Sequence, residues 1–234
     1  MMIYFGSIVN AGLIVIGAVL GLLLKKTIPE RLQEILFQCC GLITLFLGFS
    51  MASEMKNMII VVLSLMVGTI VGEYFSLEDK LETFGNKLKS RLANNEKSFT
   101  QGFVVATMLY CIGSMSIIGA MDGALRNNHS ILITKGILDG FMSIVFASTY
   151  GIGVLFSIFP LLLYQCGITT IAYFLENFFT DFLISQLTGL GGILILGLGI
   201  SLLKLKNIKV MNFTPSFIFV VLFSWCYELL WMNR

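Results

Sequence analysis

The sequence predicts an all-α protein, a polytopic bundle of about eight transmembrane helices that forms a single integral membrane domain over residues 1–234. Apolar residues make up 57% of the chain and charged residues 12%, and the mean hydropathy is +0.92. The apolar residues fall in runs of about 20, the length that a helix needs to cross a bilayer. A soluble domain carries about 25% charged residues, so a surface with this little charge suits lipid.

Hydropathy places the spans in order. The first apolar run starts at Met2 with no basic residue ahead of it and no small-residue cleavage site, which favours a true first span over a cleaved signal peptide. The fifth and sixth spans share one long apolar run, in which Pro160 is the expected corner because proline cannot continue a helix. If one of these two segments is re-entrant, the chain has seven spans. The predicted spans are 3–24, 31–51, 57–75, 101–119, 136–159, 160–178, 185–203 and 213–232.

The basic residues predict the orientation. With the N-terminus outside, eleven of the fifteen Lys and Arg residues lie in cytoplasmic segments and four lie on the outer side. Cytoplasmic loops of membrane proteins are enriched in Lys and Arg. The split therefore favours an even number of spans with both termini outside.

One long polar connection, 76–100, interrupts the apolar pattern. Its apolar residues recur at helical spacing and form a single stripe beside a charged face. We expect an amphipathic connector helix at the cytoplasmic interface. The stripe consists of Leu77, Leu81, Phe84, Leu88 and Leu92.

Glycine is abundant, with 23 residues that mostly lie inside the spans. Small residues let helices approach closely in lipid, where burial of apolar surface gives little drive for association. The pattern predicts close helix packing and a homo-oligomer through the glycine faces. The GxxxG pairs are Gly17/Gly21, Gly68/Gly72, Gly119/Gly123 and Gly136/Gly140.

Polar residues inside spans are candidate functional residues, because lipid solvates them poorly. The segment 111–123 holds two serines, three glycines and an aspartate, which a continuous transmembrane helix tolerates poorly. It predicts a broken helix whose freed carbonyls line protein or water, with Ser114, Ser116 and Asp122 as candidate ligands. Asp122 could instead cap a short helix over 123–134.

The fifth span contains Asp139, about one turn inside its outer boundary, and then Ser148 and Thr149. A carboxylate at this depth is expected to meet a cation, a water-filled cavity, or Lys135 one turn earlier on the same helix. An ion or proton site and a simple Lys135–Asp139 pair are both open alternatives.

Other polar groups fall in the outer half of the predicted membrane. Groups at one depth on separate helices suggest a shared outward-facing cavity. The alternative is ordinary hydrogen bonding between helices, which contributes about 1 kcal/mol or less per pair. These residues are Ser7, Asn10, Gln186, Thr188 and Glu228.

Enzyme chemistry is not expected, because the chain lacks the nucleophile, metalloprotease and phosphate-loop motifs, and no cofactor is predicted. The five cysteines show no metal-ligand spacing, and whether a metal binds stays open. A net charge of +2 does not suggest nucleic acid as a partner. The expected partners are the lipid bilayer, a small solute or cation, and further copies of this chain.

Nearly the whole chain resembles the bacterial domain of unknown function 554 family of integral membrane proteins. The resemblance rests on GSIVNAGLIVIGAVLG, CIGSMSIIGAMDGAL, ITKGILDGFMSIVFASTYGIGVLFS, LLLYQ and VMNFTPS. Thr214 departs from the NLLP-like core of the last motif. The resemblance implies a multi-span protein of a bacterial inner (cytoplasmic) membrane and supplies no catalytic residue. The positions that match the family pattern include Asn10, Ser114, Asp122, Gly123, Asp139, Gly140, Ser148, Thr149 and Gln165.

The leading hypothesis is passage of a small solute or ion through a site between spans one, four and five. Asp139 would bind a cation or proton, and Ser114, Ser116, Ser148 and Thr149 would supply neutral oxygens. A second hypothesis is a non-transporting structural or regulatory subunit. A third is a membrane enzyme that acts on lipid, which a long lipid-accessible groove ending at Asp122 and Asp139 would favour.

Overall fold

The computed structural model describes residues 2–24, 29–92, 98–111, 114–125, 127–174 and 180–232. Every regular element in these ranges is a helix. In order they are η1 (Met2–Tyr4), α1 (Phe5–Leu24), α2 (Glu30–Ala52), α3 (Met58–Tyr74), α4 (Leu77–Leu92), α5 (Phe99–Cys111), α6 (Ser114–Leu125), α7 (Ser130–Tyr150), α8 (Gly153–Phe156), α9 (Ile158–Phe174), α10 (Asp181–Leu202), η3 (Val210–Phe213), α11 (Ser216–Tyr227) and the π-helical η4 (Glu228–Met232).

The predicted helical membrane bundle is confirmed. Within the described ranges, six segments are long and apolar enough to cross a membrane: α1, residues 34–52 of α2, α7, α8 with α9, α10, and residues 210–230. A seventh is α3 joined to the first part of α4, bent by 53°. The shorter apolar helix α5 would bring the count to eight, so the predicted number of about eight spans agrees roughly with the structure.

The turn between the fifth and sixth predicted spans lies at Gly151, so Pro160 was the wrong corner. α7 ends at Tyr150, and Gly151 has a φ of 82°, which favours glycine because a Cβ would be strained there. Pro160 is the third residue of α9. In the first turn of a helix the missing N–H of proline leaves no helical hydrogen bond unmade.

The predicted fourth span is divided between two helices. α5 ends at Cys111 and α6 begins at Ser114, and the two residues between them lie outside the described ranges. The alternative of a helix over 123–134 capped by Asp122 is wrong. Asp122 lies inside α6, and the next helix begins only at Ser130.

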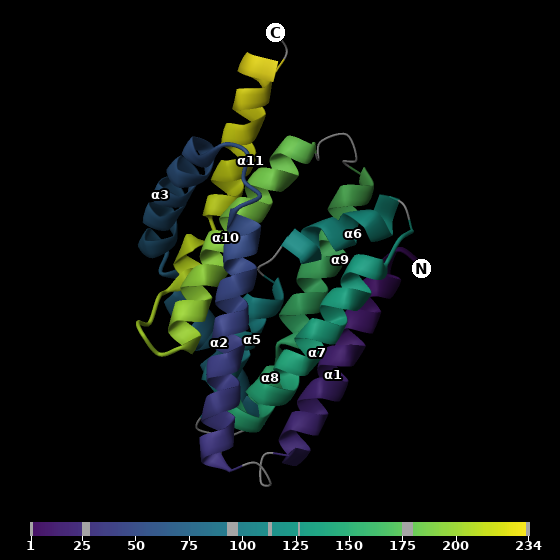
Figure 1. Ribbon diagram of the computed structural model, residues 1–234, viewed down its shortest axis with the longest axis vertical. Coiled ribbons are helices and arrows are strands. Elements are labelled where there is room, and N and C mark those ends of the chain that lie inside the picture. The colour runs from purple at the N-terminus through teal and green to yellow at the C-terminus, as the bar shows by residue number, and fades with distance from the viewer. Residues whose placement is uncertain are drawn as a thin grey trace.

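The helices form two groups, with α5 in contact with both (Figure 1). The first bundle consists of α1, α6, α7, α8 and α9, in which α1 lies along α7. The second bundle consists of α2, α3, α10 and α11, in which α2 packs on α10 and α3 on α11. We call the end that holds Tyr4 and Tyr227 the terminal end, and the end that holds α4 the connector end. Figure 1 marks the N-terminus beside the upper end of α1 and the C-terminus above α11.

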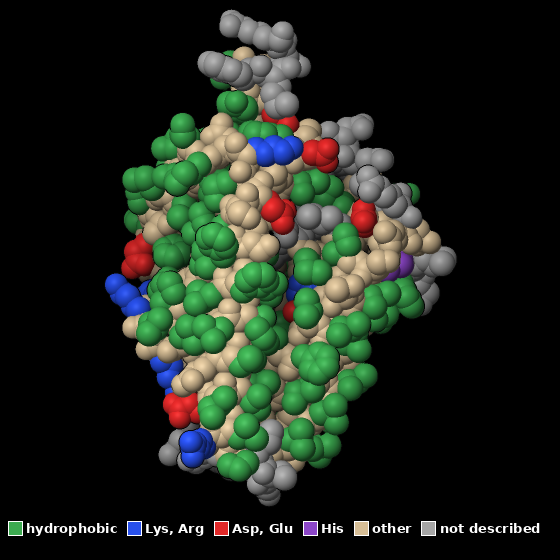
Figure 2. All heavy atoms as spheres, in the orientation of Figure 1, with side chains coloured by type: hydrophobic (Ala, Val, Ile, Leu, Met, Phe, Trp, Pro, Cys, Tyr) green, Lys and Arg blue, Asp and Glu red, His purple; other side chains and the backbone are tan. Residues whose placement is uncertain are grey.

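Glycines set the distance between the paired helices. A Cβ on Gly17 of α1 would meet the carbonyl oxygen of Gly140 on α7, and one on Gly72 of α3 would meet that of Asn212. These contacts lie within one chain, so a homo-oligomer would need another surface than these glycine faces. Outside them the surface is largely hydrophobic: Figure 2 shows apolar side chains over most of one face, as expected where lipid is the solvent.

The amphipathic connector is helical, as its stripe predicts. Phe84 of α4 lies 6.0 Å from the ring of Phe103 on α5, and Leu81 packs against the buried core. The apolar side of α4 therefore contacts the bundle itself.

Candidate functional site

A buried ion pair lies inside the first bundle. The ammonium of Lys135 donates a hydrogen bond to the carboxylate of Asp139 one turn later on α7. Lys135 is 5% exposed and Asp139 is 6% exposed. Of the two sequence alternatives for Asp139, the structure contains the pair, and Lys135 is the cation that faces this carboxylate.

α5 supplies an aromatic residue to the pair. The ammonium of Lys135 lies 6.0 Å from the ring centroid of Tyr110, within the range of a cation–π contact. The Ser143 hydroxyl donates to the backbone carbonyl of Asp139 at 2.7 Å. Because that donation uses the only hydroxyl hydrogen of Ser143, the Tyr110 hydroxyl is the donor in the 2.6 Å bond between the two side chains. Tyr110 is thus held against α7 beside the ion pair.

α1 and α9 contribute buried polar side chains that have no hydrogen-bond partner among the described residues. These are Ser7, Asn10 and Gln165, and all three are 0% exposed. The Asn10 amide lies beside Asp139 without reaching ordinary hydrogen-bond geometry. An unpaired buried polar group costs about 1–3 kcal/mol, so a polar ligand that bonded these groups would be held favourably.

The position of Gln165 follows from a contact at the terminal end. Tyr4 and Thr170 are joined by a hydrogen bond of 3.0 Å, and α1 also contacts α8, so α9 runs antiparallel to α1. Gln165 precedes Thr170 by five residues, about 7.5 Å along the helix. This places it at about the depth of Asn10. We call Ser7, Asn10, Tyr110, Lys135, Asp139, Ser143 and Gln165 the polar cluster.

The structure brings some predicted site residues together and separates others. Asn10 joins Asp139, and Ser116 lies nearby, since its hydroxyl donates to the Tyr110 carbonyl at 3.1 Å. Ser148 and Thr149 instead donate to the Val145 carbonyl of their own helix. They follow Asp139 by nine and ten residues, about 14 Å along α7.

The remaining predicted ligands lie at α6. Asp122 is half-buried in its last turn, where its backbone carbonyl accepts a hydrogen bond from the Asn128 N–H at 3.1 Å. The Ser114 side chain lies outside the described part of the chain. Tyr110 was missed from the sequence, although a tyrosine far from a membrane interface is itself a signal, because its hydroxyl needs a partner there.

The predicted shared cavity does not include the polar groups of the second bundle. The Gln186 side chain accepts from the backbone N–H groups of Lys56 and Asn57 at 3.2 Å and donates to the Asn57 carbonyl. Thr180 donates to the Glu228 carboxylate at 2.6 Å. These bonds join α10 to the α2–α3 turn, and Thr180 to η4, at the terminal end of the second bundle.

A second polar region lies at the connector end, around Asn212 of the VMNFTPS motif. The Asn212 amide donates to the Glu73 carboxylate at 2.6 Å and accepts from the Glu78 N–H at 2.7 Å. The Glu78 carboxylate accepts from the Met211 N–H at 2.9 Å. A cavity of about 400 Å³ adjoins it, lined in part by Glu78 and Glu82. Asn212 therefore fixes the bend between α3 and α4 against η3.

Comparison with known proteins gives a family match over almost the whole chain. The family model described as "Protein of unknown function (DUF554)" matches residues 5–225. The "Uncharacterized membrane protein YdfK" of Bacillus subtilis (strain 168) is 36% identical over 91% of this chain and 92% of its own length. The "Uncharacterized protein YqgA" of Escherichia coli (strain K12) is 30% identical over 90% of this chain and 92% of its own length. No solved structure gives a significant match.

Proposed function

This chain belongs to the DUF554 family, and we propose that it carries a small polar solute or an ion across the membrane. The observation that carries the proposal is the buried Lys135–Asp139 pair. The amide of Asn10, unpaired among the described residues, lies beside it, and the side chains of Ser7 and Gln165, unpaired in the same sense, lie on the neighbouring helices α1 and α9. Charged residues within membrane spans are costly and usually mark solute or ion pathways.

The charges of the pair restrict how a ligand binds. Lys135 compensates Asp139, so the polar cluster is neutral as a whole. A cation or proton that binds Asp139 would displace the Lys135 ammonium from it. An anionic group that binds Lys135 would displace the Asp139 carboxylate instead. Asn10, Ser7 and Gln165 would complete the contacts with neutral oxygens and amides.

The division into two bundles supports the same proposal. Many transporters work by the rocking of one helix bundle against another around a central site. Here the polar cluster lies in the first bundle except for Tyr110, which is on α5, and α5 contacts helices of both bundles. A shift of α5 would move the Tyr110 ring relative to Lys135.

The test is thermal unfolding of the detergent-purified protein against a panel of ions, pH values and small metabolites. A ligand at about 100 times its dissociation constant should stabilise the folded state by about 2.7 kcal/mol. The same panel is applied to Lys135→Met/Asp139→Leu, in which both charges are replaced together. We expect a shift in the parent that the double variant loses. A shift of equal size in both proteins would remove the pair from the site.

The predicted orientation and assembly belong to this proposal. We propose a bacterial inner membrane, as the family implies, with both termini outside, as the basic residues indicate. We also expect further copies of the chain as partners. A reporter enzyme that is active only in the periplasm, fused after Arg234, should therefore be active. An inactive fusion would place the C-terminus in the cytoplasm and contradict the orientation. No enzyme activity is part of this proposal.

A further inference from the structure

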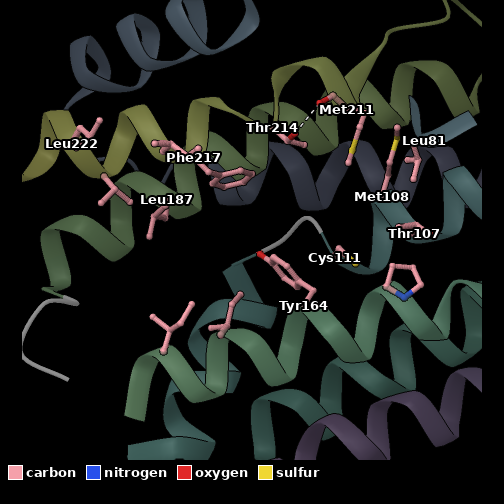
Figure 3. A pocket seen from close by; sticks show the side chains of 15 residues that line it. Leu81, Thr107, Met108, Cys111, Tyr164, Leu187, Met211, Thr214, Phe217 and Leu222 are labelled. Atoms are coloured by element: carbon pink, nitrogen blue, oxygen red, sulfur yellow. Dashed lines mark hydrogen bonds between the residues drawn. The ribbon is translucent and has the colours of Figure 1, made fainter. Parts of the chain in front are cut away.

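A cavity lies between the two bundles and apart from the polar cluster. Its volume is about 750 Å³, within the range of about 300–1,000 Å³ typical of ligand sites. One wall is α9, the opposite wall is α10 and α11, and α5 closes one side (Figure 3).

The lining gives little for a polar ligand to bind. No charged side chain is among the residues that line it. Its polar side chains include those of Thr107, Tyr164 and Thr214. The Thr214 hydroxyl donates to the Met211 carbonyl at 2.8 Å, and the Thr107 hydroxyl is a buried lining group that has no hydrogen-bond partner among the described residues. Apolar cavities of this kind stay dry and bind apolar molecules.

The mouth of the cavity is continuous with the hydrophobic outer surface. Three of its lining residues, Ile171, Ile218 and Leu222, are 51%, 63% and 47% exposed. They belong to spans that contact lipid, so the cavity opens towards the hydrocarbon of the bilayer.

The lining and the position of the cavity favour a hydrocarbon chain as the occupant. The α9 wall extends from Pro160 to Ile171, a rise of about 16 Å along the helix. A single hydrocarbon chain is long, thin and apolar, and it is the solvent on this side of the protein.

We infer that this cavity binds an acyl chain of a membrane phospholipid. The inference is independent of the proposed function, since it rests on the cavity between α9 and α11. The two features share α5, where Tyr110 faces Lys135 and the next residue, Cys111, lines the cavity. A bound chain would therefore brace the helix that positions Tyr110.

Quenching of a single tryptophan tests the inference. Trp225 and Trp231 are replaced by Phe, and one Trp is introduced by Phe217→Trp, a lining position, or by Phe46→Trp, which is 72% exposed on α2. The proteins are reconstituted in phosphatidylglycerol vesicles with and without bromine on the acyl chains, and acrylamide serves as the aqueous quencher. We expect brominated chains to quench Phe217→Trp about as strongly as Phe46→Trp, and acrylamide to quench neither.

A cavity-filling variant separates the cavity from the outer surface. Ile168 lines the cavity on α9, and Ile168→Phe narrows it, so the bromine quenching of Phe217→Trp should fall measurably while that of Phe46→Trp stays unchanged. If quenching at position 217 did not fall on filling, the bromine would reach it from outside, and the inference would fail. Strong acrylamide quenching would show a water-filled cavity and overturn it as well.

Discussion

Asp139→Asn is expected to destabilise the folded protein by about 3–5 kcal/mol, the cost of breaking a buried ion pair by removing one partner. The Lys135 ammonium would stay at 5% exposure without its carboxylate, and the Tyr110 ring at 6.0 Å compensates only part of a full charge. Chemical unfolding in a mild detergent, followed by the far-ultraviolet signal of the helices, measures the loss.

Two control variants are compared with Asp139→Asn in the same unfolding experiment. Asp79→Asn removes the carboxylate of the exposed Lys209–Asp79 pair, whose side chains are 49% and 59% exposed, and should cost about 1 kcal/mol or less. Lys135→Met/Asp139→Leu replaces both buried charges with apolar groups and should recover most of the stability. Equal losses for Asp139→Asn and Asp79→Asn would show that water reaches the buried pair.

The double variant also separates a structural role of the pair from a functional one. A pair that only holds α7 in place can be replaced by packed apolar side chains without loss of function. A pair that binds a solute cannot be replaced in this way without loss of binding. A folded double variant that no longer responds to any ligand recognised by the parent therefore assigns the pair to binding.

Local features of the fold could be read from the sequence. Hydropathy finds spans because a helix in lipid must satisfy its backbone groups internally. The Lys135–Asp139 pair follows from a spacing of four on one helix. The break between α5 and α6 follows from the glycines and serines of 111–123. Each of these depends on residues close together in the chain.

Contacts between distant residues could not be read in the same way. Tyr110 and Ser143 are 33 residues apart, and no local pattern joins them. Hydropathy did not locate the turn at Gly151, because the run is apolar on both sides of it. Ser148 and Thr149 bond to a carbonyl of their own helix, a local alternative that the sequence does not distinguish from a ligand role.

Depth in the membrane also proved insufficient to define a site. Asn10 and Gln186 were both expected in the outer half. The structure places Asn10 beside Asp139 in the first bundle, and Gln186 at the α2–α3 turn in the second. Which helices pair is decided by small residues that allow close approach, and these pairs are set by the whole fold.

Gly17→Leu is therefore expected to be among the most damaging substitutions, with a loss of about 3 kcal/mol or more, at the upper end of the overpacking range. Its side chain would meet the backbone carbonyl of Gly140, which cannot move without shifting α7. Separation of α1 from α7 would also draw Asn10 away from Asp139. Unfolding in detergent measures the stability, and the ligand panel measures the effect on binding.

Gly12→Leu is the matched control on the same helix. A Cβ on Gly12 would have nothing within 4 Å, so leucine should be neutral or stabilise α1 by up to about 1 kcal/mol through helix propensity. Size-exclusion chromatography completes the comparison. If Gly17→Leu dissociated an oligomer and left the stability of each copy unchanged, the Gly17 face would join two chains, and the close α1–α7 contact would not be the one that holds the first bundle together.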